Sequence, residues 1–152
     1  MPKRHPGTGR GRAAPALVFV DSSAWIALFS ARDRHHEEVD RAFRAAVADS
    51  VRLVTTSLVL SEVHRFQLFH AGIAAAARAL DAIDASRLVR VAFPHAEHHA
   101  GARRWLAKLP DQAISYVDAV SFAFMEAERL RAALTLDRDF AIAGFEMWQR
   151  VQ

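Results

Sequence analysis

Short runs of apolar and β-forming residues recur along the chain and predict β-strands. The clearest run, Leu-Val-Phe-Val at residues 17–20, has no polar position, which is typical of a strand buried on both faces of a parallel sheet. Similar runs predict strands at residues 52–55, 87–91 and 132–136, with a short last strand at 145–148. A sheet of four to five strands is therefore expected.

Segments with a helical spacing of apolar residues separate these runs and predict six helices. They cover residues 24–31, 35–48, 58–70, 73–83, 94–108 and 115–131. Ser22 and Ser23 precede the first of them and are suited to cap it, while Pro94 fits the first turn of the fifth. Alternating strands and helices favour an α/β fold whose mostly parallel sheet is covered on both faces.

The composition fits one domain with a basic tail. With 152 residues, 52% of them hydrophobic, the chain can bury one core, which we place at residues 17–152. Residues 1–16 are rich in Gly and Pro and hold four basic residues and no acid, so we expect a disordered tail. Without those four the chain has 16 basic residues against 17 acids, so the domain itself carries about −1. The tail could contact nucleic acid loosely, but a solvated extension or a wrongly assigned start codon is the preferred interpretation.

The chain contains no cysteine, which fits a reducing compartment. No apolar stretch is long enough to cross a bilayer, and the basic first residues lead into no hydrophobic segment of the kind found in signal peptides. We therefore expect a cytoplasmic protein that does not act in a membrane.

Acidic residues directly follow two of the predicted strands. Asp21 ends the first run, and Asp137 follows the fourth, with Asp139 two residues later. In open α/β sheets, ligands bind at the carboxyl ends of the strands. Each acid also has a plain structural explanation, because Asp21 suits a helix cap and Asp137 and Asp139 suit a polar turn.

Two further acids lie on apolar helices. Glu62 shares a stripe with Leu58 and Phe66, where an ionised carboxylate is costly unless it is paired, for example with Arg65, or bound to a metal. Asp118 lies in the first turn of a helix that continues Ala-Val-Ser-Phe-Ala-Phe-Met. The helix dipole alone can explain an acid there, but its apolar neighbours indicate deep packing.

Taken together, the two acids that follow strands, Asp21 and Asp137, and the two on helices, Glu62 and Asp118, predict a metal site. Carboxylates gathered at one edge of a sheet repel one another and raise each other's pKa, and a hard divalent cation relieves this repulsion. Mg²⁺ prefers oxygen ligands from a few carboxylates, water and substrate phosphates. Such a site suits hydrolysis of a phosphodiester, because the ion orients the scissile phosphate and activates water.

The same segments resemble the PIN domain family, most closely the VapC-type toxins of toxin–antitoxin pairs. The resemblance covers about residues 17–150. Its motifs are Val-Asp-Ser-Ser-Ala-Trp at 20–25, Ser-Glu-Val at 61–63, Ser-Tyr-Val-Asp-Ala-Val-Ser-Phe-Ala-Phe-Met at 115–125, Thr-Leu-Asp-Arg-Asp-Phe at 135–140 and Ala-Gly-Phe at 143–145. One departure is His64-Arg65, where many members have a second acid or a polar residue, and it makes the local charge less negative.

The resemblance implies a three-layer α/β/α fold and an endoribonuclease that uses Mg²⁺ or Mn²⁺ and is held inactive by a cognate VapB-type antitoxin. The residues it implies for the metal and for catalysis are Asp21, Glu62, Asp118 and Asp137, with Asp139 as the alternate fourth acid. Ser23 and Thr135 match supporting hydroxyl residues near the metal. We expect cleavage of RNA to a 5′-phosphate and a 3′-hydroxyl, with Arg65 and Arg138 contacting phosphate.

Other interpretations remain open. The domain could be a PIN nuclease of RNA maturation or DNA processing without an antitoxin, or a binding module that uses its acids only for structure. A phosphatase or receiver-like pocket is disfavoured, because it expects a Lys at a strand end and the only Lys after residue 17 is Lys108. His95 and His99 have the spacing of a metal pair but fit a solvated face better, and the three tryptophans fit the core better than base stacking. Helices 58–70 and 73–83 could pair two subunits or pack in the core.

Overall fold

The computed structural model describes residue 15 and residues 17–148, and it contains one five-stranded sheet. The strand order is β3-β2-β1-β4-β5, and each neighbouring pair is parallel. The strands are β1 (Leu17–Val20), β2 (Arg52–Thr56), β3 (Val89–Ala92), β4 (Ala132–Leu134) and β5 (Glu146–Met147). The predicted parallel sheet of four to five strands is confirmed.

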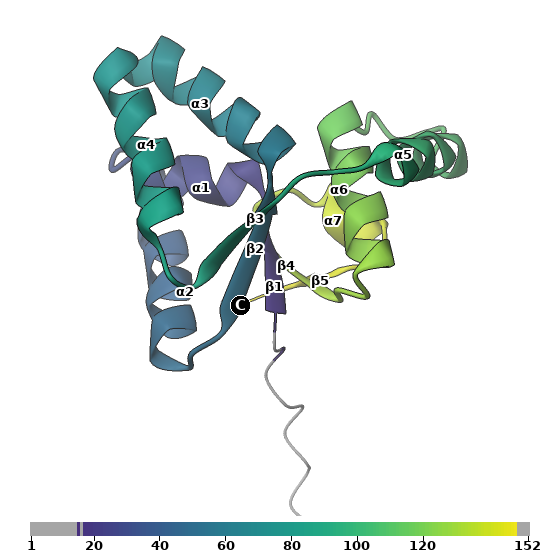
Figure 1. The fold of residues 1–152 in the computed structure, drawn as a ribbon, viewed down its shortest axis with the longest axis horizontal. Coiled ribbons are helices and arrows are strands. Elements are labelled where there is room, and N and C mark those ends of the chain that lie inside the picture. The colour runs from purple at the N-terminus through teal and green to yellow at the C-terminus, as the bar shows by residue number, and fades with distance from the viewer. Residues whose placement is uncertain (1–14, 16, 149–152) are drawn as a thin grey trace, which may run out of the picture.

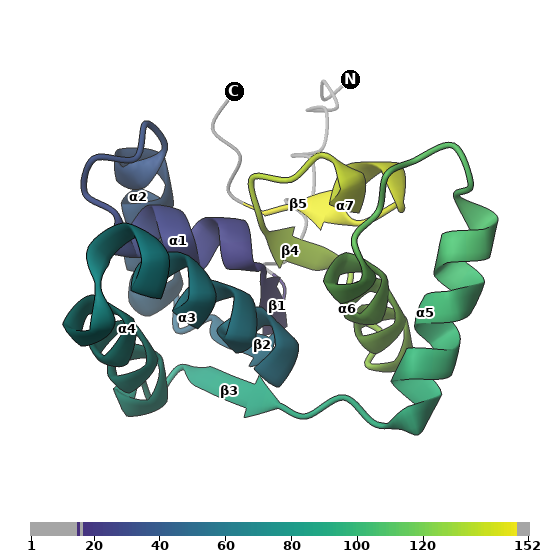
Figure 2. The same ribbon diagram turned by 90° about the horizontal axis from the view of Figure 1, so that it is seen from above.

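Seven helices cover the sheet on both faces. They are α1 (Ser22–Phe29), α2 (His36–Ala48), α3 (Ser57–Ala71), α4 (Ile73–Ala85), α5 (Ala96–Lys108), α6 (Tyr116–Ala127) and α7 (Asp139–Ile142). Helices α1 to α4 lie on one face and α5 to α7 on the other (Figures 1 and 2). The expected three-layer α/β/α fold is thus present.

Strand β1 lies at the centre of the core. Val18, Phe19 and Val20 are fully buried, and the register pairs Phe19 with Val54 of β2 on one side and Ala133 of β4 on the other. A run of apolar residues buried on both faces is what a central parallel strand requires. This strand therefore fixes the position of the residue that follows it, Asp21.

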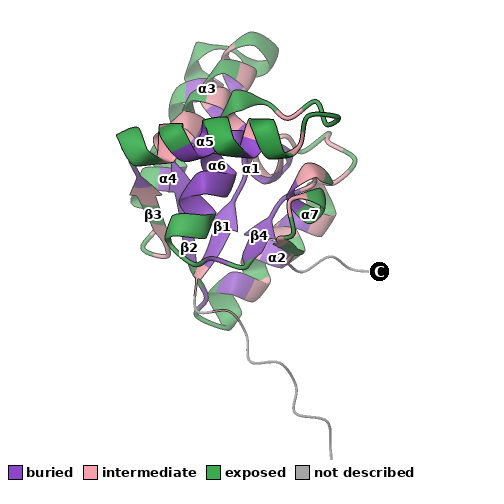
Figure 3. Cartoon of the chain, turned by 90° about the vertical axis from the view of Figure 1, so that its right-hand side faces the viewer, coloured by how far each residue is buried: buried purple, intermediate pink, exposed green. Residues whose placement is uncertain are grey.

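Helix α6 is the most enclosed of the helices, since every residue from 118 to 125 is buried. It lies between the sheet and helix α5 (Figures 2 and 3). Gly101 of α5 permits this close approach, because a Cβ at that position would lie 2.8 Å from the Cβ of Ala123. The deep packing expected around Asp118 is confirmed.

Several predicted boundaries are wrong by a few residues. Helix α1 begins at Ser22 rather than at residue 24, because the Asp21 carboxylate accepts the Ser23 backbone N–H and caps the helix itself. Helix α5 begins at Ala96 rather than at Pro94, because His95 and His98 form a capping box. Strand β4 ends at Leu134 rather than at residue 136, because the Leu136 N–H bonds to the Ser23 hydroxyl instead of a neighbouring strand.

Two further differences concern the last third of the chain. Helix α6 ends at Ala127 instead of residue 131, where Arg129 takes a positive φ of 55° and turns the backbone toward β4. The four-residue helix α7 was not expected. The proposed tail, residues 1–16, lies outside the described residues except for Pro15. The division between tail and domain therefore stays a prediction.

Candidate active site

The candidate site lies where the order of the strands reverses. From the central strand β1 the chain moves outward through β2 to β3, then crosses to the other side of β1 to form β4 and β5. The carboxyl ends of β1 and β4 are therefore neighbours at a switch point, the place where ligands bind in open α/β sheets. The hydrogen bond from the Asp21 N–H to the Leu134 carbonyl, 3.1 Å, joins the two strand ends.

Asp21 is the most buried of the site acids, with 2% of its surface exposed. Its Oδ2 accepts hydrogen bonds from the Ser23 hydroxyl at 2.7 Å and the Thr135 hydroxyl at 3.1 Å, and its Oδ1 accepts one from the Ser22 hydroxyl at 3.4 Å. Burial raises the pKa of Asp21, and the hydrogen bonds from Ser23, Ser22 and Thr135 oppose that rise. Asp21 is thus both the helix cap and a part of the acid cluster.

Ser23 and Thr135 hold this carboxylate against the loop that carries the next acids. The Ser23 hydroxyl also accepts the Leu136 N–H at 3.0 Å, and the Thr135 hydroxyl accepts the Asp137 N–H at 2.9 Å. Each hydroxyl therefore donates to Asp21 and accepts from the backbone that follows β4. The positions of Asp21 and Asp137 are coupled through two side chains.

Asp118, Asp137 and Asp139 form the tightest group of acids. One carboxylate oxygen from each lies within 4.8 Å of the others, and this is the sole group of three metal-ligating side chains found within the described residues. Asp118 is delivered by the first turn of α6, capped by Ser115, whose Oγ accepts the Asp118 N–H at 3.0 Å. The Asp137 Oδ1 accepts the Asp139 N–H at 2.9 Å, so the two acids lie in one turn.

Glu62 approaches from the opposite side, on the second turn of α3. It is half-buried, and burial is the largest cause that raises its pKa, with the negative charge of Asp21 adding to it and the Ser22 side chain opposing it. The charge of Glu62 also raises the pKa of Asp118. Asp118 therefore lies within electrostatic reach of Asp21, Glu62 and Asp137, and of these four acids only Asp118 and Asp137 belong to the tight group.

Asp118 has a strongly raised pKa. Burial and the negative charges of Asp21, Asp137 and Glu62 raise the pKa of Asp118 to about 7. The pKa of Asp139 is raised by burial and by Asp137. In the part of the chain that the structure describes, the ion pairs are His35–Glu38, Arg44–Asp40 and Arg90–Glu128, so none neutralises a site acid.

The chemistry of these side chains fits a hard divalent cation. Every candidate ligand is a carboxylate oxygen, the donor that Mg²⁺ and Mn²⁺ prefer. Burial is the largest cause of the raised pKa of Asp118, and the repulsion by Asp21, Asp137 and Glu62 adds to it. A bound cation would relieve that repulsion. The donor set suits Mg²⁺ better than a zinc ion, which favours nitrogen and sulfur ligands.

Neither arginine expected at phosphate belongs to the acid cluster. The guanidinium of Arg65 lies 5.4 Å from the centre of the Phe69 ring rather than beside Glu62. Arg138 is exposed at the start of α7, between Asp137 and Asp139. Both are at the rim of the site.

Other sequence predictions near the site have clear outcomes. Trp25 and Trp105 are buried and Trp148 packs against the core, so their preferred role in packing is confirmed. His99 contacts the Tyr116 hydroxyl at 2.8 Å, and His95 stacks with His98. Ser22 was expected only as a cap, and its hydroxyl also donates to the adjacent Asp21. Its contact with Glu62 depends on how α1 packs against α3, which no local pattern encodes.

The sequence of this chain matches a known protein family and a curated relative over most of its length. The model of the PIN domain family matches residues 18–146. The 23S rRNA-specific endonuclease VapC20 of Mycobacterium tuberculosis is 34% identical over 129 residues, which is 85% of this chain and 95% of that protein. The same protein is found in two strains of that organism.

Solved structures show the same fold. The crystal structure of M. tuberculosis VapC20, described as a sarcin–ricin loop cleaving toxin, matches with a TM-score of 0.76 at 34% identity over 84% of this chain and 95% of that one. VapBC2 from Rickettsia felis, bound to a DNA fragment from its promoter, matches with a TM-score of 0.66 at 12% identity over 86% and 96% of the two chains. No helix among the described residues is long and apolar enough to span a membrane.

Proposed function

Because the chain belongs to the PIN domain family, we infer that it is a metal-dependent endoribonuclease of the VapC toxin type. The observation that carries this inference is the group formed by Asp118, Asp137 and Asp139, whose oxygens lie within 4.8 Å of one another at the switch point of the sheet. The relative that covers most of the chain is itself named as an endonuclease of 23S rRNA.

We propose that Asp21, Glu62, Asp118 and Asp137 form the catalytic and metal-binding set, with Asp139 as a further or alternate ligand. When bound, Mg²⁺ or Mn²⁺ would neutralise charge on the scissile phosphate and activate a water molecule. Asp118, Asp137 and Asp139 would supply oxygen ligands from the tight group, and Asp21 and Glu62 would add their carboxylates to the set. Ser23 and Thr135 hold the Asp21 carboxylate in one orientation through their hydroxyl groups.

The remaining roles concern the RNA. Arg65 and Arg138 lie at the rim of the acid cluster, where a guanidinium can contact the phosphates on either side of the cleaved bond. Hydrolysis leaves a 5′-phosphate and a 3′-hydroxyl, with water as the nucleophile. The substrate class is a ribosomal RNA stem-loop of the sarcin–ricin type, since the 34% identical relative carries that activity in its name.

The proposed protein partner is a cognate VapB-type antitoxin that holds the enzyme inactive, as the resemblance to VapC-type toxins implies. The homodimer and the cytoplasmic location expected from the sequence stay predictions. Size measurement in solution, alone and with the product of an adjacent reading frame, tests the dimer and the antitoxin together.

Cleavage of an end-labelled sarcin–ricin stem-loop tests the assignment of the acids. With Mg²⁺ present, Asp21→Asn and Asp118→Asn should each lower the cleavage rate by at least about 100-fold, because each removes a ligand or its neighbour in the charge cluster. The circular dichroism spectrum should stay that of the folded protein, and Asp81→Asn, a change of the same kind on the exposed face of α4, should cleave at the wild-type rate.

A wild-type rate in Asp118→Asn would remove that residue from the metal site. Failure of the wild-type protein to cut this stem-loop, with cleavage of other RNAs, would overturn the substrate and leave the chemistry in place. Sequencing of the cleaved 5′ ends then identifies the RNA.

A further inference from the structure

A groove runs alongside the acid cluster on the α1 and α3 side. It has a volume of about 430 Å³ and is lined by Ser22, Ile26, Glu62, Arg65, Phe66, Phe69 and His70. Ser22 and Glu62 belong to both the groove and the acid site, since Ser22 contacts both Asp21 and Glu62. The groove is therefore continuous with the place where the scissile phosphate is proposed to bind.

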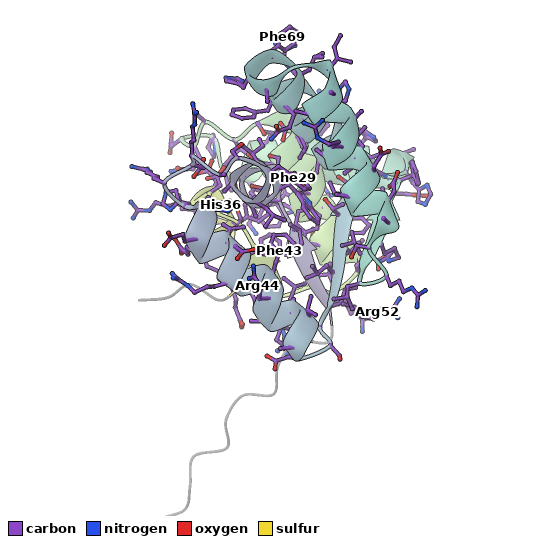
Figure 4. All side chains as sticks on the ribbon, turned by 90° about the vertical axis from the view of Figure 1, so that its left-hand side faces the viewer. Phe29, His36, Phe43, Arg44, Arg52 and Phe69 are labelled. Atoms are coloured by element: carbon purple, nitrogen blue, oxygen red, sulfur yellow. The ribbon has the colours of Figure 1, made fainter. Side chains whose placement is uncertain are left out.

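The wall of this groove combines aromatic rings with basic groups. The rings of Phe66 and His70 are stacked, with centroids 3.9 Å apart and planes at 10°. The Arg65 guanidinium lies over the ring of Phe69, 5.4 Å from its centre, and Phe69 is 71% exposed. Figure 4 shows Phe69 at the outer end of helix α3. The ring of Phe69 therefore has an accessible face beside a guanidinium, an arrangement that can take a stacked base.

These features match a nucleotide better than an apolar peptide. Bases stack on exposed aromatic rings and on guanidinium planes, and phosphates bind arginine. A purely apolar partner would leave Arg65 and Glu62 against an apolar surface, where charges are expensive. An RNA strand satisfies each part of the wall: its base contacts the rings, its backbone contacts Arg65, and its scissile phosphate reaches the acids beyond Glu62.

We propose that this groove is the subsite for the base of a nucleotide that flanks the cleaved bond, with Phe69 and Phe66 as the stacking surface and Arg65 on the adjoining phosphate. The inference rests on the proposed endoribonuclease function and adds to it a determinant of sequence or structure preference. The three residues are substrate-positioning residues rather than metal ligands.

Abasic substitution in the RNA tests the subsite. A stem-loop that the wild-type protein cleaves is prepared with a single abasic nucleotide at each position next to the cleaved bond. For the wild-type protein, one of these positions should lower kcat/KM about 10-fold to 100-fold, as expected for loss of one stacked base. Phe69→Leu, which keeps an apolar side chain at an exposed position, should lower kcat/KM on intact RNA by a similar factor.

The decisive result is the combination of the two changes. In Phe69→Leu, the abasic RNA should be cleaved as well as the intact one, because the stacking partner is already lost. Phe66→Leu should show the same loss of sensitivity at the same nucleotide, with KM rather than kcat carrying most of the change. Phe93→Leu is the matched control: Phe93 is 69% exposed, follows β3 and is outside the groove, so the full abasic sensitivity should remain.

Unchanged abasic sensitivity in both Phe69→Leu and Phe66→Leu would overturn the subsite and assign the groove to a protein partner instead. The same conclusion follows if the control Phe93→Leu loses its sensitivity to the same degree. If the wild-type protein cleaves no RNA, the proposed function itself fails. This outcome is distinguishable from failure of the subsite, in which the wild-type protein cleaves RNA and the variants keep their abasic sensitivity.

Discussion

At the scale of single residues, the site depends on how acids are held together against their repulsion. Asp21 is held by two hydroxyl groups, Asp137 by its contact with the Asp139 N–H, and Asp118 by its place in a capped first turn. Burial and neighbouring charge both oppose ionisation of these groups. The protein therefore stores electrostatic strain at the position where a cation is proposed to bind.

The pH dependence of stability without Mg²⁺ follows from Asp118. Its pKa is about 7 in the folded protein and near 3.8 in a model peptide. Between these values the folded state keeps a proton that the unfolded chain releases, so the free energy of unfolding falls as pH rises from about 4 to 7. The loss from this group is on the order of 2 to 4 kcal/mol.

Urea unfolding at pH 5.5 and pH 8 in the presence of EDTA measures this effect. The wild-type protein should be more stable at the lower pH, and Asp118→Asn should lose a large part of that difference and gain stability at pH 8. Equal pH dependence in the variant would mean that other acids, such as Asp21 and Glu62, account for it.

Thr135 gives a second prediction at this scale. Its hydroxyl joins the Asp21 carboxylate to the Asp137 N–H. Thr135→Val therefore removes the side-chain acceptor of the Asp137 N–H and leaves Asp21 with its hydrogen bonds from Ser22 and Ser23. The RNA cleavage rate should fall about 10-fold to 100-fold, as for other groups that orient metal ligands. Thr135→Ser keeps the hydroxyl and should cleave close to the wild-type rate; a matching loss in the serine variant would indicate a packing effect of the methyl group.

At the scale of elements, Asp118 depends on the packing of α6 between the sheet and α5. The contact is close only because Gly101 has no side chain at a point where a Cβ would meet that of Ala123. The two helices therefore behave as one unit that presents the acid. A change in their spacing would move Asp118 relative to Asp137 and Asp139.

Gly101→Ala tests this contact. Replacing a glycine within a helix by alanine normally stabilises the protein. Here the added Cβ would lie 2.8 Å from the Cβ of Ala123, so Gly101→Ala should instead lower the free energy of unfolding by about 1 to 3 kcal/mol. Chemical denaturation measures the free energy of unfolding, and Ala107→Ser on the exposed face of α5 is the control, expected to change it by about 0.5 kcal/mol or less. A stabilised Gly101→Ala would show that the helices can separate without cost.

Local pattern predicted most of these elements, and its errors have physical causes. Asp21 and Asp137 were found because strand runs end visibly before them. Helix α7 was missed because four residues carry no helical period. The choice between Asp137 and Asp139 stayed open because the resemblance allows an acid at either position, and in the structure both belong to the tight group. The groove beside Glu62 was not predicted, since it arises from the packing of α1 against α3.

At the scale of the whole molecule, the acids come from four parts of the chain and tie the two sides of the sheet together. Glu62 is carried on the side of β2, while Asp118, Asp137 and Asp139 are carried on the side of β4 (Figure 1). A cation bound between them would favour the folded state alone, because the unfolded chain does not bring these residues together.

Thermal unfolding with and without Mg²⁺ tests this coupling. The Tm of the wild-type protein should rise with Mg²⁺ concentration, by about 4 °C for each 1.4 kcal/mol that Mg²⁺ binding adds to the free energy of unfolding. Asp118→Asn should show little or no rise. EDTA should abolish RNA cleavage, and added Mn²⁺ should restore it; cleavage that persists in EDTA would contradict a metal-dependent reaction.

The insertion of β4 beside β1 has a consequence for synthesis of the protein. The central sheet position next to β1 is filled by residues translated more than a hundred positions later, and the Asp21 carboxylate meets its partner Thr135 only then. A nascent chain that stalls on the ribosome before this point contains no complete set of acids. A chain that lacks residues 132–139 therefore has neither the second strand beside β1 nor two of the three acids of the tight group.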